Sequence, residues 1–373
     1  MSLWGLGMAV VLDPSTRGQG SLLSIQVLRG FAALSVVVSH LQREFEIGLG
    51  MPGPLPKAVI LLGGAGVDLF FVISGFIMVY VATPLFGRRD APALFFLRRA
   101  VRIIPLYWAV SGVLLAYVLR SYSDLASANM SVASIVTTFF FLPYPKPDGT
   151  VVPLNGIGWT LNYEMFFYAV FAIAILATRS AAVIGISVLF VVMSVTAVLF
   201  GPLPNPLAFW TDSIILDFVF GMWVALAFGN GVRLPGWGSY GLVVAGVVGI
   251  AGSALGEIDW LPRFLILGAP AALIVAGLVL SGRPPRTGIV WWALGHLGDA
   301  SYALYLVHPL VATIPRRAFP GLLDLASHPW LSGSVLVLAA VVAAIAVHFL
   351  FERPVTRALQ KCIAERTHRR GAG

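Results

Sequence analysis

Long apolar segments constrain this chain more than any other feature of its sequence. A helix crosses a bilayer with about 20 consecutive apolar residues, and ten segments of this kind can be placed along the 373 residues. They lie at about 22–42, 58–82, 104–120, 159–178, 181–200, 209–229, 238–255, 263–281, 293–314 and 331–351. Only 11% of the residues are charged, whereas a soluble domain averages about 25%. We therefore predict an all-α fold, a polytopic transmembrane helical bundle of about ten spans.

The same segments suggest a simple domain organisation. Residues 1–21 are expected to form a cytoplasmic N-terminal segment, residues 22–353 one transmembrane domain, and residues 354–373 a cytoplasmic basic tail. Residues 132–142 form a further apolar run, but eleven residues are too few for a span and suit a re-entrant or surface helix. If this run did cross the membrane, every later loop would change sides.

Lysine and arginine indicate the orientation. With the N-terminus inside and ten spans, sixteen of the 24 Lys and Arg residues fall inside, seven fall outside, and Arg29 lies within the first span. The positive-inside rule thus favours both termini in the cytoplasm. We expect a multi-pass protein of the cell (inner) membrane. Because arginine-rich inner loops explain the net charge of +8, no nucleic-acid partner is predicted.

The first apolar segment carries two ionisable residues, Arg29 and His40. They are eleven residues apart, which is 20° past three full turns of a helix, so both side chains share one face. The rise of about 1.5 Å per residue separates them by roughly 16 Å along the axis. Ionisable groups inside the hydrocarbon are costly, so function is the default hypothesis. The alternative is that Arg29 snorkels to lipid headgroups and His40 is a packing residue.

Three further titratable residues are candidates for the outer half of the membrane. Asp68 is near mid-membrane in the second span, where it can meet His40 and raise the basicity of the imidazole, or it can serve as a structural partner of another donor. Glu164 is one to two turns from the outer surface and is a second candidate acid or base. His308 precedes Pro309, which can break the helix and present the imidazole to a cavity.

Two arginines are candidates for binding an anion. Arg99 and Arg102 are three residues apart at the start of the third span, so they share a face at the inner surface. Two guanidinium groups at a helix N-terminus suit phosphates. Alternatively, they are ordinary positive-inside anchors.

The sequence does not indicate a metal site. His40, Asp68, Glu164 and His308 are residue types that bind metals, but no short-range spacing of ligands supports such a site. The single cysteine, Cys362, excludes an internal disulfide and a cysteine-based metal site.

Taken together, these motifs resemble the acyltransferase 3 family of integral membrane acyltransferases. The order and placement of the motifs across nearly the whole chain carry the resemblance. They are Arg29 with ten residues before His40, Gly66–Phe76, Arg99 with Arg102, Trp159–Glu164, Tyr302–Pro309 and Glu352–Pro354. One departure is Asn162-Tyr163, where small or hydrophobic residues often precede the glutamate.

The resemblance implies an O-acetyltransferase that moves an acyl group, commonly acetyl from acetyl-CoA, to a sugar hydroxyl. Expected acceptors are an exopolysaccharide, O-antigen or glycolipid, and the stand-alone architecture looks most like that of exopolysaccharide acetylases. Acyl-CoA is then a substrate, no cofactor is bound permanently, and membrane lipid surrounds the enzyme. The oligomeric state is not indicated.

The residues would then take the following roles. His40 accepts the proton of the acceptor hydroxyl or, in a variant mechanism, carries the acyl group. Asp68 or Glu164 orients His40 or the acceptor. Arg29, Arg99 and Arg102 hold the phosphates of CoA. The alternative class is a secondary transporter that exports a glycolipid or small acid, since intramembrane His and Asp also suit proton relays. No internal repeat supports that class.

Overall fold

The computed structural model describes residues 16–49, 57–122, 125, 128–201, 203–256, 258, 260–282, 288–318 and 328–371. Within these ranges the chain forms helices and no strand, which confirms the all-α prediction. The chain divides into two compact units. Unit 1 comprises Met1–Val81 and Leu216–His348, and unit 2 comprises Ala82–Ile215 and Phe349–Gly373. Residues 1–15 of the expected N-terminal segment lie outside the described residues.

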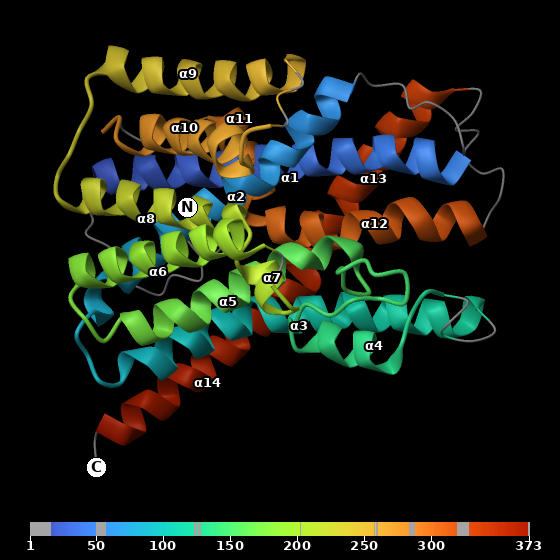
Figure 1. Cartoon of the computed structure of the whole chain (residues 1–373), viewed down its shortest axis with the longest axis horizontal. Coiled ribbons are helices and arrows are strands. Elements are labelled where there is room, and N and C mark those ends of the chain that lie inside the picture. Colours follow the sequence, from blue (N-terminus) through green and yellow to red (C-terminus); the bar gives the residue numbers. More distant parts are fainter. Residues whose placement is uncertain are drawn as a thin grey trace. The chain divides into compact units, whose positions relative to one another are not determined.

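Unit 1 is a bundle of mostly apolar helices (Figure 1). Its elements are α1 (Thr16–Leu49), α2 (Lys57–Ala82), α8 (Leu216–Gly229), α9 (Gly236–Leu255), the π-helical turn η5 (Phe264–Gly268), α10 (Ala269–Val279), α11 (Ile289–Asp299), α12 (Ser301–Ala318) and α13 (Pro329–Val347). α9 lies along α10, α13 lies along α12, and α1 contacts both α11 and α12.

Glycines allow the helices of unit 1 to approach until their backbones touch. A Cβ added to Gly63 of α2 would lie 2.1 Å from the Cβ of Ser39 on α1. A Cβ added to Gly221 of α8 would lie 1.9 Å from the carbonyl oxygen of Val72 on α2. Small residues are the usual means of close helix packing in membranes, where lipid is as apolar as the side chains. α2 therefore packs closely on the side chain of Ser39 on α1 through Gly63, and its main chain at Val72 packs directly on Gly221 of α8.

Unit 2 contains the other helices. They are η2 (Thr83–Leu85), α3 (Ala91–Ser121), α4 (Val132–Phe139), η3 (Gly156–Gly158), α5 (Trp159–Ala174), α6 (Arg179–Phe200), α7 (Leu207–Trp210), η4 (Ser213–Ile215) and α14 (Arg353–Gly371). α14 packs against α3, and the π-helical turn η6 (His348–Glu352) joins α13 to α14 along the chain. Aromatic side chains form the core between α3 and α5, where the rings of Phe95 and Phe171 are 4.9 Å apart.

Six helical segments of the described chain are long and apolar enough to cross a membrane. They are Leu22–Gln42, Val59–Leu85, Ala91–Ser121, Arg179–Phe200, Gly236–Leu255 and Pro329–Glu365. Ser213–Gly229 and Phe264–Val279 are shorter apolar helices. These segments agree with a membrane protein, and the count of ten spans and the cytoplasmic termini stay predictions.

The run at 132–142 agrees with its expected form, because it contains only α4, a helix of eight residues that at about 1.5 Å per residue is too short to span. Two other segments differ from their expected form. The segment expected at 293–314 is two helices, because α11 ends at Asp299 and α12 starts at Ser301. α3 begins at Ala91, well before the expected residue 104, because Pro92 occupies its first turn, where a proline is tolerated. Arg99 and Arg102 therefore lie inside a long helix and not at its start.

The contact between α2 and α8 predicts a difference between two Gly→Ala variants. Gly221→Ala places its methyl group against a backbone carbonyl, and overpacking of this kind costs about 1–3 kcal/mol. Gly241→Ala on α9 adds a methyl group with nothing within 4 Å and gains helix propensity. We expect thermal unfolding of the purified protein in detergent to show a lower midpoint for Gly221→Ala only. Equal midpoints would contradict the close approach.

The single cysteine tests the predicted orientation. Cys362 is exposed on α14, and the expected cytoplasmic tail contains it. A membrane-impermeant maleimide should not label it in intact cells but should label it after permeabilisation. The control is Thr150→Cys in a Cys362→Ser background, because Thr150 is exposed in a loop predicted to lie outside. Labelling of Cys362 in intact cells would reverse the predicted side of the tail.

Candidate active site

His40 and His308 meet in unit 1. His40 Nδ1 on α1 lies 2.9 Å from His308 Nε2 on α12, and the two ring centroids are 5.1 Å apart. The other nitrogen of His308, Nδ1, lies 3.0 Å from the carbonyl oxygen of Leu304, one turn earlier on α12. His308 is buried and His40 is half-buried. Two residues that the sequence analysis treated as separate candidates are thus one hydrogen-bonded pair.

This arrangement determines where the protons lie when both rings are neutral. A carbonyl oxygen only accepts, so His308 Nδ1 carries its proton and donates it to Leu304. His308 Nε2 then has a lone pair and accepts, and His40 Nδ1 donates to it. The lone pair of His40 is consequently on Nε2. A second group that holds the tautomer of an imidazole is the usual way to orient a histidine base.

The sequence suggested that Pro309 breaks the helix after His308, but the helix is continuous there. α12 continues from Ser301 to Ala318 through this proline. His308 reaches His40 because α12 packs along α1. Arg29 is buried on the same continuous helix as His40, so the helical spacing places both side chains on one face, as expected.

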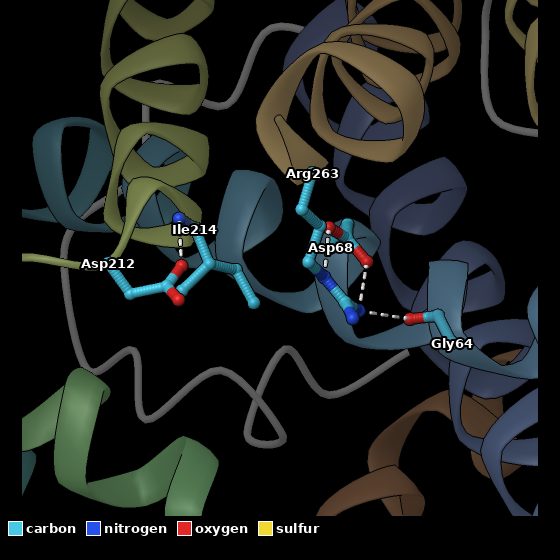
Figure 2. Close-up of polar contacts among 5 residues, drawn as sticks. All are labelled: Gly64, Asp68, Asp212, Ile214 and Arg263. Carbon is cyan, nitrogen blue, oxygen red and sulfur yellow. Dashed lines mark hydrogen bonds and ion pairs between the residues drawn. The ribbon is translucent and has the colours of Figure 1, made fainter. Parts of the chain in front are cut away.

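Asp68 pairs with Arg263, as Figure 2 shows. Arg263 donates from Nε to Asp68 Oδ1 at 3.1 Å and from Nη2 to Asp68 Oδ2 at 2.7 Å. Nη2 also donates to the carbonyl oxygen of Gly64 at 3.1 Å. The side chain of Asp68 is fully buried, whereas 36% of the Arg263 side chain is exposed. Of the two readings of Asp68 in the sequence, partner of His40 or structural partner of another donor, this contact matches the second.

From the sequence, Arg263 is expected on the outer side of the membrane and Asp68 near its middle. A carboxylate inside a membrane requires a cation, and this requirement is the only signal in the sequence for Arg263. Nothing in the sequence indicates that residues 195 positions apart meet.

Figure 2 also shows Asp212 in unit 2, whose Oδ1 accepts from the backbone N–H of Ile214 at 2.9 Å. That contact caps η4 and is local.

In unit 2, Glu164 and Arg99 are close enough for their charges to interact. The hydroxyl of Tyr168 donates to Glu164 Oε1. Arg99 is buried, and it interacts with the charges of Glu164 and Arg102 and with Tyr168. Among the described residues no hydrogen-bond acceptor faces Arg99 Nε. A buried guanidinium with an unsatisfied N–H is suited to hold an anion.

This neighbourhood differs from the depths expected from the sequence. Arg99 was predicted at the inner surface and Glu164 near the outer one. They approach because α5 packs on α3. Arg102, one turn beyond Arg99, is half-buried on the same helix. Among the described residues no group of three or more His, Cys, Asp or Glu side chains is arranged to hold a metal.

Comparison with known proteins identifies the family. The model of an acyltransferase domain, acyltransferase 3, matches residues 22–353. The chain is 32% identical over 307 residues to the exopolysaccharide production protein ExoZ of Rhizobium meliloti, and the match covers 79% of this chain and 90% of that protein. It is 28% identical over 370 residues to the acyltransferase MdmB of Streptomyces mycarofaciens, covering 91% of this chain and 92% of that protein.

A third relative is longer than this chain. The peptidoglycan O-acetyltransferase OatA of Listeria monocytogenes is 24% identical over 225 residues, which are 55% of this chain and 33% of that protein. No solved structure matches the chain. Because the family model covers the sequence from the first expected span to the last, and because the relatives match most of the chain, the protein belongs to the acyltransferase 3 family and is an acyltransferase.

Proposed function

We propose that this enzyme transfers an acetyl group from acetyl-CoA to a hydroxyl group of a cell-surface or exported carbohydrate, in the cell inner membrane. The single observation that carries the mechanism is the hydrogen bond between His40 and His308, 2.9 Å long. It joins the half-buried ring to a buried one whose second nitrogen is held by a backbone carbonyl. A histidine held in one tautomer is a suitable general base.

The reaction is an acyl transfer with His40 as base. The acceptor hydroxyl oxygen attacks the carbonyl carbon of the thioester, and its proton goes to Nε2 of His40. The tetrahedral intermediate collapses, the carbon–sulfur bond breaks, and the sulfur of CoA leaves with the proton from His40. His308 keeps the proton of His40 on Nδ1 throughout, so Nε2 is the atom that accepts and returns the transferred proton.

Arginines are proposed to bind the acyl donor. CoA carries phosphate groups, and the guanidinium is the side chain that best matches them. Arg99 supports this role because it is buried and has an N–H group for which the described residues supply no acceptor. Arg102 lies next to it on α3, and Arg29 is the corresponding cation of unit 1, three helical turns from His40.

A carbohydrate is proposed as the acceptor because of the relatives. Among them are an exopolysaccharide production protein and a peptidoglycan O-acetyltransferase. A secondary transporter would use similar intramembrane groups without breaking a thioester. The two classes separate in one assay, because only a transferase releases free thiol from acetyl-CoA in the presence of glycan acceptors.

The first prediction concerns the base. His40→Ala should lower glycan acetylation by about 10²–10⁴-fold, the usual contribution of a general base, while acyl-CoA binding and insertion remain. His308→Gln should retain more activity than His308→Ala, because its amide oxygen can still accept from His40 Nδ1. The control is His296→Ala, a half-buried histidine whose described contact is with Trp292 in its own helix. Near wild-type turnover of correctly folded His40→Ala would refute the mechanism.

The second prediction concerns the donor site. Arg99→Ala or Arg102→Ala should weaken acetyl-CoA binding by about 1.5–3 kcal/mol, the scale of a hydrogen bond to a charged group. Lysine should restore only part of the affinity, because it lacks the planar fork of arginine. Titration calorimetry on the detergent-purified protein measures both. Arg88→Ala, which removes an exposed arginine paired with Asp90, is the matched control and should leave binding unchanged. Unaltered binding in an Arg99→Ala/Arg102→Ala double variant would leave these arginines as membrane anchors.

A further inference from the structure

We propose that Arg263, held in place by Asp68, is a catalytic residue that stabilises the negative charge on the thioester carbonyl oxygen during acyl transfer. The inference rests on the proposed function. It assigns a role to an ion pair that neither the predicted base nor the predicted donor site uses. It also changes the role of Asp68 from a partner of His40 to a positioning residue that acts through Arg263.

The ion pair holds the guanidinium in one orientation. Both carboxylate oxygens of Asp68 accept from Arg263, on Nε and Nη2, and Gly64 accepts a second bond from Nη2. A two-point contact of this kind fixes the plane of the guanidinium as well as its position. The two partners differ in access, because Asp68 is fully enclosed and 36% of the Arg263 side chain is exposed. A ligand can therefore approach this pair only from the arginine.

The backbone around Arg263 is also held firmly. Arg263 immediately precedes the π-helical turn η5, and π-helical turns occur frequently at functional sites. The turn ends at Gly268, where an added Cβ would lie 1.8 Å from Oδ1 of Asp217 on α8. Asp217 is itself fully buried. The start of η5 is thus tied to α2 by the ion pair, and its end is packed closely on α8.

Arg263 lies at the same level of unit 1 as the histidine pair. Gly64, which accepts from Arg263, follows Gly63, and Gly63 packs directly on Ser39 of α1. Ser39 precedes His40 in the chain. The contacts Arg263–Gly64 and Gly63–Ser39 therefore place the arginine and the histidine beside neighbouring residues of α2 and α1.

Aromatic contacts also link α2 to the histidine pair through α12. The ring of Phe70 on α2 is 5.8 Å from that of Tyr305 on α12, and Tyr305 is 6.3 Å from His308. α1, α2, α12 and the start of η5 thus contribute to one layer. The layer contains the proposed base His40, its hydrogen-bond partner His308 and the partly exposed cation Arg263.

That set of groups matches the charges of acyl transfer. When the acceptor oxygen bonds to the thioester carbon, the electron pair of the C=O bond moves to the carbonyl oxygen, and the hydroxyl proton moves to His40. Arg263 donates to the resulting oxyanion, which loses its charge again when the carbon–sulfur bond breaks. Preorganised donors at the oxyanion contribute about 10²–10³-fold in rate, because they act where water is excluded.

The competing explanation is that Arg263 only neutralises Asp68. Removal of one partner also lowers the stability, since it leaves a charge unpaired, so the activity of a single variant is informative only when it is normalised to the folded fraction. The decisive variant is Asp68→Asn/Arg263→Gln, which replaces the ion pair with a neutral pair that can still form a hydrogen bond. We expect this double variant to keep a melting temperature near that of the wild type and its KM for acetyl-CoA within about threefold. Its kcat for glycan acetylation should fall by about 10²–10³-fold.

Two further variants are assayed beside the double variant. Arg263→Lys retains the charge but not the fork, and its kcat should lie between those of the wild type and the double variant. His40→Ala is assayed in parallel. A folded double variant with wild-type kcat would overturn the assignment of Arg263 and leave it as a counter-ion. Full activity of His40→Ala would instead overturn the proposed function itself.

If the double variant unfolds, a second measurement decides. Asp68→Asn alone retains Arg263 and should keep more activity than Arg263→Gln alone, when each rate is normalised to the folded fraction. Equal losses in the two single variants would overturn the catalytic assignment.

Discussion

Ionisable side chains in an apolar helical bundle require partners, and unit 1 depends on two such pairings. A charge placed in hydrocarbon is costly, and an unpaired polar group in the interior of a protein is destabilising. Asp68 satisfies both of its oxygens with Arg263, and His308 satisfies both of its nitrogens with His40 and Leu304. In each pairing one member, Arg263 or His40, is less buried than the other.

The close helix packing makes these pairings possible. Gly63 brings α2 against the side chain of Ser39 on α1, and Gly221 brings α8 against the main chain of Val72 on α2, so the helices have little freedom to shift. Long side chains at those positions would hold the helices apart and would break hydrogen bonds of about 3 Å. The chemistry of this acyltransferase thus rests on residues that have no functional groups of their own.

The two units contribute different chemistry. Unit 1 contains the histidine pair and the partly exposed Arg263, which suit proton transfer and the stabilisation of developing negative charge. Unit 2 contains the buried Arg99 beside Glu164 and Tyr168, which suits the binding of an anionic donor.

The sequence by itself determined the helical fold, the membrane character and the common face of Arg29 and His40. These follow from the lengths of apolar runs and from the helical repeat, which are properties of neighbouring residues. Only the tertiary structure decided the partners. Asp68 and Arg263 are 195 positions apart, and His40 and His308 are 268 apart, so no local pattern pairs them. The sequence also contained no sign that one expected span is divided into α11 and α12, because the two helices form one apolar run. The division shows only in the tertiary structure, where each of the two helices packs on α1.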